Sequence, residues 1–429
     1  PAIQLENNSM LIVTPYDSMR IKETDGTFLL KNRVYAGENA VINWPADNRN
    51  FKGAVVNLGK FYIRADRADF WSPNATLTFP KLFQGSVSGA YEFKSQTRKP
   101  NQLSNFPKFT SNESNIDLIL PMTNVRYRGG IEISGNRLSG ASVSRRPGKL
   151  TLLDGKGNQA ILRSERFEFR ADSVITSASA RLTIKHGSDS LIHPSVEVFY
   201  DTKTRKLALL RTKEYNVTPF VSSYFQVNVN AQIINWDMKT DSINFSILNG
   251  KDLIPVTIES RDFFSQERFS RLSAGFQFHP VITSVFYANK FNTREFADQE
   301  IANHFNVPLK QVRGAMKLLK QFGFAKYNPE TGLVQLNDKA FHYHDASGQK
   351  VDYDNLLIPS LSPNLPNATW RLDSGDMKVT GVSRFYYTSD FKVYAEPKDQ
   401  VMTLLKGRNI EMDGMVNAGD FQYKGKDYL

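Results

Sequence analysis

The sequence predicts a mainly β protein made of repeated short antiparallel strands, in a jellyroll-like or solenoid-like arrangement, with one small helical insertion. Three observations support this prediction. Short apolar runs carry aromatic residues at alternate positions, as strands with one buried face require. Turn-forming residues separate these runs at intervals of about 8–12 residues. One long stretch, residues 293–336, shows the spacing of amphipathic helices instead.

Length and composition narrow the possibilities further. A chain of 429 residues with 40% hydrophobic side chains is long enough for several domains with their own cores. The absence of Cys excludes disulfide bonds, thiolate nucleophiles and cysteine-bound zinc or iron-sulfur clusters. The net charge of +11 would attract nucleic acid, anionic lipid or acidic polysaccharide, but the cations are spread along the chain and select no partner.

The first β unit is expected at residues 1–94, where short strands alternate with turn residues. A passage rich in Ser, Asn and Pro follows at residues 95–115, and we interpret it as a loop or linker. The expected strands of the first unit are residues 11–13, 27–30, 40–44, 54–58, 61–64 and 75–79.

A second β domain is expected at residues 116–286. Its clearest strand places Phe167 and Phe169 on one face, and Arg166, Glu168 and Arg170 on the other. A similar alternation runs through residues 178–185. Both segments have the pattern of strands with one buried face.

The helical stretch is expected to form a module at residues 287–340. A first helix places Ile301 and Phe305 on one face, and after Pro308 a second helix carries an apolar stripe. Two short strands, at residues 324–327 and 333–336, follow with a turn between them. The stripe of the second helix consists of Leu309, Val312, Met316, Leu319 and Phe322.

Helix, short turn, longer helix and hairpin together resemble a winged helix-turn-helix module. In that family the second helix enters the major groove of DNA, so the resemblance would make its cations phosphate contacts. These cations are Lys310, Arg313, Lys317 and Lys320. We favour the alternative that this face is solvated and that the module packs against protein, because fold analogy does not supply function.

The densest group of potential metal ligands lies in residues 341–366, which we expect to form a loop. His342, His344 and Asp345 are weak candidate ligands, since imidazole and carboxylate suit zinc, manganese or iron. On a strand, His342 and His344 would point the same way. Asp352 and Asp354 follow in the sequence. We favour a polar loop without metal, because no third ligand stands at a diagnostic spacing.

Catalytic patterns are sparse in this sequence. His186, Asp189, Ser190 and His193 include the residue types of a hydrolase triad, but no nucleophile-elbow sequence accompanies them. The sequence also lacks a glycine-rich phosphate loop. We therefore expect no catalytic residues, no cofactor-binding residues and no cofactor.

An internal repeat links the two ends of the chain. Residues 61–73 align without a gap on residues 385–397, and both segments begin with Phe and end with Pro. Three similarities in the same order favour a true repeat over chance resemblance between aromatic strands. Residues 367–429 would then be a second, truncated β unit, and the chain would be part of a longer protein. The other two similarities pair residues 85–94 with 414–424, and residues 39–40 with 367–368.

Short strands, polar turns and a recurring unit together resemble the β-repeat envelope proteins. Examples are the OstA/LptA-type lipopolysaccharide-transport modules, the larger AsmA/TamB-type bridges and the large uncharacterised exported proteins of Bacteroidetes-type bacteria. The resemblance implies an open, elongated β structure that serves as plain scaffold or as a greasy trough for acyl chains. It also implies an extracytoplasmic location, in the periplasm or on the surface of a Gram-negative bacterium, which the absence of Cys fits.

The favoured function is a non-enzymatic structural or scaffold protein of the cell envelope, with a conduit for lipid as a variant. Expected partners are other envelope proteins or lipid rather than nucleic acid, and the oligomeric state is open. A DNA-associated protein and a polysaccharide-binding or polysaccharide-cleaving β-solenoid are the alternatives. A conduit needs a continuous aliphatic groove, whereas a sugar site needs exposed Trp or Tyr with convergent carboxylates. No transmembrane helix is expected, because the sequence has no run of 18 apolar residues.

Overall fold

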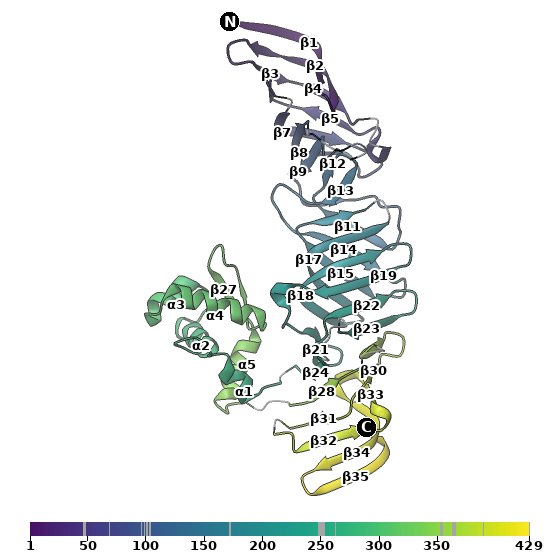
Figure 1. The fold of residues 1–429 in the computed structure, drawn as a ribbon, viewed down its shortest axis with the longest axis vertical. Coiled ribbons are helices and arrows are strands. Elements are labelled where there is room, and N and C mark those ends of the chain that lie inside the picture. The colour runs from purple at the N-terminus through teal and green to yellow at the C-terminus, as the bar shows by residue number, and fades with distance from the viewer. Residues whose placement is uncertain are drawn as a thin grey trace. The chain divides into compact units, whose positions relative to one another are not determined.

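The computed structural model describes residues 1–428 apart from 46–48, 68, 96, 98, 100–101, 103, 171–172, 248–253, 262, 352–354, 363–365 and 389. The chain divides into two compact units. Unit 1 comprises residues 1–181 and 198–205, and unit 2 comprises residues 182–197 and 206–429. Both units are mainly β with antiparallel strand pairing, which confirms the predicted fold class (Figure 1).

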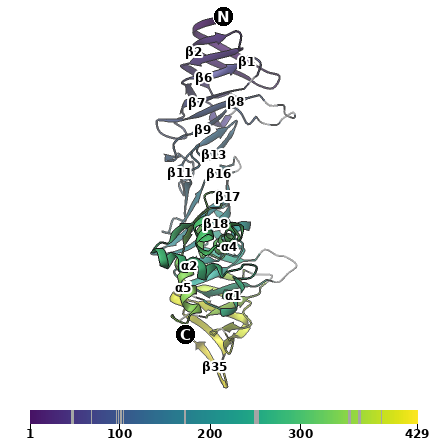
Figure 2. The ribbon, with the colours of Figure 1, turned by 90° about the vertical axis from the view of Figure 1, so that its left-hand side faces the viewer.

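Unit 1 is a succession of antiparallel strands, with β1 and β2 beside the N-terminus and β17 at the other end of the unit (Figure 2). Strands β17 and β18 contribute residues to both units. The elements are β1 (Ala2–Val13), β2 (Ser18–Leu29), β3 (Val34–Glu38), β4 (Ala40–Asn43), η1 (Arg49–Phe51), β5 (Val55–Leu58), β6 (Phe61–Arg64), β7 (Asp69–Thr78), β8 (Ser86–Lys94), β9 (Lys108–Ser111), β10 (Ile116–Asp117), β11 (Val125–Gly129), β12 (Glu132–Ser134), β13 (Arg137–Gly140), β14 (Gly148–Leu153), β15 (Gln159–Ser164), β16 (Phe167–Phe169), β17 (Val174–His186) and β18 (Asp189–Asp201).

Unit 2 continues with further antiparallel strands and contains the helices. Its strands and 3-10 helices are β19 (Lys206–Arg211), η2 (Lys213–Tyr215), β20 (Phe220–Ser222), β21 (Val227–Asn230), β22 (Ile233–Asp237), β23 (Ser242–Ser246), β24 (Val256–Ser260), β28 (Leu357–Ser360), β29 (Ala368–Arg371), β30 (Met377–Thr380), β31 (Phe385–Tyr386), β32 (Val393–Pro397), η3 (Lys398–Gln400), β33 (Val401–Leu404), η4 (Lys406–Arg408), β34 (Ile410–Ala418) and β35 (Phe421–Tyr428). Between β24 and β28 lie α1 (Gln266–Arg271), α2 (Pro280–Phe291), β25 (Glu295–Ala297), α3 (Asp298–Phe305), α4 (Leu309–Gln321), β26 (Ala325–Tyr327), β27 (Leu333–Leu336) and α5 (Asp338–Ser347).

Strand β8 shows why these sequences form strands with one buried face. Its side chains alternate, so that Tyr91 and Phe93 are buried while Glu92 and Lys94 face the opposite side. Gly89 on the buried side is required by the close approach of β9, because a Cβ atom there would lie 2.4 Å from the carbonyl oxygen of Thr110.

Residues 39–94 and 367–424, the segments of the predicted repeat, have the same pattern of strand pairing. In the first copy β3 pairs with β6, β4 with β5, β7 with both β5 and β6, and β8 with β7. In the second copy β28 pairs with β31, β29 with β30, β33 with β30, β32 with β31, and β34 with both β32 and β33. Phe61 on β6 and Phe385 on β31 therefore hold equivalent places, and both are fully buried.

The two copies differ where a proline interrupts the long strand. Strand β7 passes Pro73 with an irregularity in its pairing to β8 between Ser72 and Ala75, but it stays one strand. The second copy breaks at the equivalent Pro397 into β32 and β33, with η3 between them. Proline cannot donate a ladder hydrogen bond, which explains why both copies are irregular at this point.

A third copy of the same strand pattern lies between these two copies in the sequence, and the sequence analysis does not predict it. The segment Phe-Glu-Phe-Arg-Ala-Asp at residues 167–172 matches Phe-Tyr-Ile-Arg-Ala-Asp at residues 61–66. Strand β13 pairs with β16, β14 with β15, and β17 with both β15 and β16, as in the first copy. Phe167 is fully buried like Phe61 and Phe385.

The helices form an insertion within one β hairpin. Strands β24 and β28 pair directly, with Val256 opposite Ser360 and Glu259 opposite Leu357, although the whole helical module lies between them in the sequence. Figure 1 shows helices α1 to α5 gathered together with β27. Strands β25, β27 and β26 form a separate three-stranded sheet within this module.

The core predicted for the helical module is confirmed. Val312, Met316 and Leu319 on α4 are fully buried, and they share one cluster with Ile301 on α3 and Val334 on β27. Residues at the margin of this cluster are only partly buried; they are Phe305, Leu309 and Phe322. Tyr327 on β26 completes the predicted set in the same cluster.

The boundaries predicted for this module were too narrow. Residues 266–271 and 280–291 are helices α1 and α2, although residues 116–286 were predicted as β. The error came from β-branched and aromatic residues in α2, which lower helix propensity but here pack into the module core. Two local features mark the start of α2. Pro280 lies in its first turn, and the Ile282 N–H donates a hydrogen bond to the His279 ring.

The loop predicted for residues 341–366 and the linker predicted for residues 95–115 also contain regular structure. Helix α5 continues to Ser347 inside the predicted loop, and its buried residues Ala340, Tyr343 and Ala346 fall on one face. Strand β28 lies in the same predicted loop. Strand β9 lies in the predicted linker and pairs with β8 and β12.

Within the described residues, no helix combines the length and the apolar character that crossing a bilayer requires.

Replacing Leu319 with Ala should lower the local stability of the helical module by about 2–5 kcal/mol, because the side chain is fully buried in its core. Hydrogen exchange of the α4 amides measures this loss. Lys317→Ala on the exposed face of the same helix is the matched control and should change stability by less than about 0.5 kcal/mol. Equal effects of the two substitutions would show that α4 is not packed as described.

Candidate functional site

The four cations predicted on α4 do not form one free face. Lys310 and Lys317 are exposed, and no ion pair involves either of them among the described residues. Lys320 pairs with Glu214 of η2, and its Nζ atom lies 5.2 Å from the centre of the Tyr215 ring. The Thr218 hydroxyl donates to the carbonyl of Gln321, so the C-terminal end of α4 packs on a loop of the β part of unit 2.

Arg313 has a structural partner within the module. Its Nε atom lies 3.1 Å from Oδ2 of Asp298, whose side chain is 4% exposed. The Tyr327 hydroxyl donates to the same carboxylate oxygen at 2.8 Å. Because Asp298 is buried, Arg313 provides the charge that this carboxylate needs, and its removal would disturb the fold as well as the surface.

The predicted metal candidates lie on a helix rather than on a strand or loop. His342, His344 and Asp345 belong to α5, where residues two apart point to different sides. Nδ1 of His344 lies 2.9 Å from Oδ1 of Asp345. Asp352 and Asp354 fall outside the described residues. In the described part of the chain, no group of three His, Asp or Glu side chains is placed to hold a metal ion.

The triad-like residues of β17 and β18 have separate structural partners. Asp189 accepts a hydrogen bond from the Ser223 hydroxyl at 2.8 Å. The ring of His186 packs against Tyr224 and Trp370, with centroid distances of 5.3 and 5.5 Å. His193 is 1% exposed, and its Nε2 atom lies 3.0 Å from the carbonyl oxygen of Thr218. Burial lowers the pKa of His193 to about 4, so it is a neutral core residue at neutral pH.

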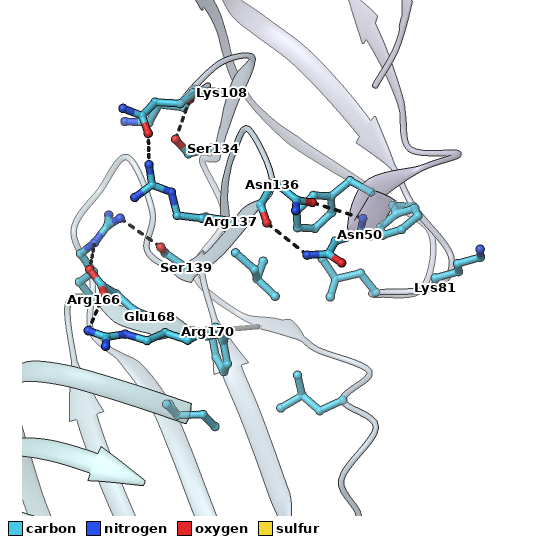
Figure 3. A pocket seen from close by; sticks show the side chains of 18 of the residues that line it. Asn50, Lys81, Lys108, Ser134, Asn136, Arg137, Ser139, Arg166, Glu168 and Arg170 are labelled. Carbon is cyan, nitrogen blue, oxygen red and sulfur yellow. Dashed lines mark hydrogen bonds and ion pairs between the residues drawn. The ribbon is translucent and has the colours of Figure 1, made fainter. Parts of the chain in front are cut away.

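A cleft in unit 1 is the best candidate for a binding site. Its volume is about 1190 Å³, and its walls come from η1, β8, β9, β12, β13, β16 and β17 with the loops between them (Figure 3). Six of its lining side chains are cationic, and two are carboxylates. The cations are Lys81, Lys94, Lys108, Arg137, Arg166 and Arg170, and the carboxylates are Glu92 and Glu168.

The walls of this basic cleft hold more positive than negative charge. Lys94 pairs with Glu92, and Arg170 lies 3.7 Å from Glu168. In contrast, among the described residues Arg137 donates to the uncharged side-chain oxygen of Asn105 and forms no ion pair, and Lys81 forms no ion pair there either. Figure 3 shows Lys108, Arg137, Arg166 and Arg170 on one side, with Lys81 on the other side beyond Asn50.

Glu132 on β12 forms ion pairs with two of these cations. It accepts from Arg166 at 3.0 Å and lies 3.1 Å from Lys108, while its own side chain is 10% exposed. Burial alone would raise the pKa of Glu132, but the hydrogen bonds from Arg166 and Lys108 outweigh burial and lower the pKa. The carboxylate therefore stays charged and fixes both cations at the wall.

The lining of the cleft also contains apolar side chains. Phe79 and Ile175 are buried, whereas Ile119 is 49% exposed and Phe106 and Phe169 are half-buried. A lining that combines cations with apolar side chains suits a ligand that combines anionic groups with less polar faces.

The sequence contained part of this site without revealing it. The alternation of Arg166, Glu168 and Arg170 predicts the polar face of a strand, and the structure confirms that these side chains are exposed. What could not be seen is the pairing of β16 with β13, which places Ser139 opposite Glu168 and brings Arg137 into the same wall. The segment Phe-x-x-Arg-Ala-Asp shared by two β units was the available signal for that pairing.

Comparison with protein families, with curated proteins and with solved structures finds no match for this chain.

Acid should destabilise unit 2 through His193. Its pKa is about 4 in the folded chain, against about 6.5 when unfolded. The unfolded state therefore binds more protons than the folded state between these pH values. The contribution of the neutral His193 ring to the free energy of unfolding is complete above about pH 6.5 and is lost as the pH falls toward 4. The total loss is about 3 kcal/mol. Urea unfolding at pH 7 and pH 4.5 measures the loss.

His193→Gln should remove this part of the pH dependence, while being less stable than the unmodified chain at pH 7. His304→Gln is the matched control, because His304 is exposed, and it should keep the pH dependence of the unmodified chain. An unchanged pH dependence in His193→Gln would contradict the assignment of a neutral buried imidazole.

Proposed function

We propose that this chain is a non-enzymatic structural protein of the cell envelope, located outside the cytoplasm, whose unit 1 binds anionic ligands in the basic cleft. The observation that carries the proposal is the charge of the cleft walls, where Lys81 and Arg137 have no carboxylate partner among the described residues. The scaffold part rests on the recurrence of one strand unit, since stacked repeats typically form extended supports.

An interior trough for acyl chains is less well supported than a scaffold. The inner side of the first β unit is filled by rings in contact: Phe61 and Phe70 have centroids 5.9 Å apart, and Phe70 and Tyr91 lie 5.7 Å apart. All three side chains are at most 4% exposed. Close-packed aromatic rings stabilise a strand unit but leave little room for a lipid tail among them.

The helical module supports the same proposal as a packing element. Its order of helix, strand, two helices and hairpin fits the winged-helix resemblance. Winged helices bind either DNA or protein, so the contacts of the α4 surface distinguish the two roles. Lys320 and Arg313 have partners within the chain, and the end of α4 packs on the β part of unit 2. These contacts favour an architectural role over DNA binding.

Replacing Lys81 and Arg137 together with Ser should weaken binding of inorganic polyphosphate by about tenfold, because two exposed cations of the cleft are lost. Isothermal titration calorimetry at low salt measures the affinity. The matched control is Lys310→Ser with Lys317→Ser, which removes the same charge from α4. An equal loss in both double variants would mean that polyphosphate responds only to net charge.

DNA binding should be weak and indifferent to sequence. A DNA-reading face with four phosphate contacts would give a slope of about −4 in log affinity against log salt, at about −0.9 per contact. We expect a shallower slope, because of the four cations on α4 only Lys310 and Lys317 have no ion pair among the described residues. Titration of duplex DNA at two salt concentrations measures it. Sequence-selective binding that the Lys310→Ser, Lys317→Ser variant abolishes would overturn the architectural role of the module.

A further inference from the structure

The outer face of unit 1 carries an exposed aromatic pair. Tyr62 on β6 and Trp71 on β7 stand directly opposite each other, and they are 62% and 56% exposed. Their neighbours along the strands, Ile63 and Phe70, are buried on the other face. Together the two rings expose an apolar surface to solvent. Such a surface is unusual, because Tyr and Trp side chains usually bury most of their surface in a core or an interface.

Strand register connects this pair to the basic cleft. Trp71 stands opposite Glu92 on β8, and Glu92 stands opposite Lys108 on β9. The row continues through Ser134 on β12 to Arg137 on β13. Directly opposed residues share one face of a sheet, so these six side chains form a continuous strip, which we name the Trp71 row. Its last four members line the cleft.

The Trp71 row is long and has two chemical halves. Five strand-to-strand steps at about 4.8 Å give a length of about 24 Å. One end offers the rings of Tyr62 and Trp71, and the other offers Lys108 and Arg137 with the remaining cations of the cleft. In the middle, the charge of Glu92 is offset by its ion pair with Lys94.

We infer that the Trp71 row binds an acidic polysaccharide, an inference that rests on the proposed anion-binding function of the cleft and names its ligand class. Sugar rings stack their apolar C–H faces on Tyr62 and Trp71, as amphipathic aromatic side chains allow. Carboxylate groups further along the same chain meet the guanidinium and ammonium groups of the cleft. A polymer fits better than a small anion or a single lipid head group, because only an extended ligand reaches both halves of the row.

The position of the tryptophans supplies a direct probe. The chain has four Trp, and Trp44, Trp236 and Trp370 are at most 3% exposed. Acrylamide quenching of tryptophan fluorescence therefore reports mainly on Trp71. Polygalacturonate oligosaccharides should protect this fluorescence from the quencher, whereas inorganic polyphosphate, which has no sugar rings, should not.

Substitutions separate the two halves of the row. Trp71→Ala and Tyr62→Ala should each weaken polygalacturonate binding by about tenfold in calorimetry and leave polyphosphate binding unchanged. The Lys81→Ser, Arg137→Ser variant should weaken both ligands. Tyr423→Ala is the matched control, because Tyr423 is 55% exposed on β35 of unit 2, and it should change neither affinity.

Three results would overturn the inference. In the first, Trp71→Ala leaves polygalacturonate affinity unchanged while the Lys81→Ser, Arg137→Ser variant weakens it. The cleft then binds anions, but the aromatic pair does not bind sugar rings. If neither variant weakens any ligand, the proposed function fails as well. If phosphatidylglycerol vesicles protect Trp71 and polygalacturonate does not, the row binds a lipid surface instead.

Discussion

The alternation of side chains across each strand is the constraint on which this structure depends. Phe61, Phe167 and Phe385 hold equivalent places in three strand units, and all three are fully buried. A slip of one residue in pairing would turn each ring toward solvent, so burial fixes the register of every neighbouring strand. The same register decides which side chains meet on the outer face. The aromatic core is therefore also what positions the cations of the cleft.

Much of the fold could be predicted from the sequence because strand and helix periods differ. The alternation around Phe167 and the stripe through Val312, Met316 and Leu319 were both interpreted correctly, since each buries one face of a regular element. Helix α2 was not predicted because its β-branched and aromatic residues are also those of strands, and their packing inside the module stabilises the helix. Helix α5 was missed because its polar residues hid a sparse buried face.

The site was harder to predict than the fold. Arg137 and Arg166 are far apart in the sequence, and each is an ordinary exposed cation when considered alone. They become one wall only through the pairing of β12, β13 and β16, together with Glu132, which contacts Arg166 and Lys108 at once. Strand pairing depends on long-range contacts that a single sequence does not display. Counting cations gave the net charge but not the place where it gathers.

The hairpin that encloses the helical module also has a consequence for the order in which the chain folds. Strands β24 and β28 can pair only after the long intervening segment has brought Glu259 and Leu357 together. A flexible segment of that length opposes pairing through its loop-closure entropy, whereas a module that has already folded through its own local contacts shortens the effective loop. Early folding of the helices would thus bring β24 and β28 together and promote their pairing. When β28 is synthesised after the module, the folded module would already hold it near its partner strand β24.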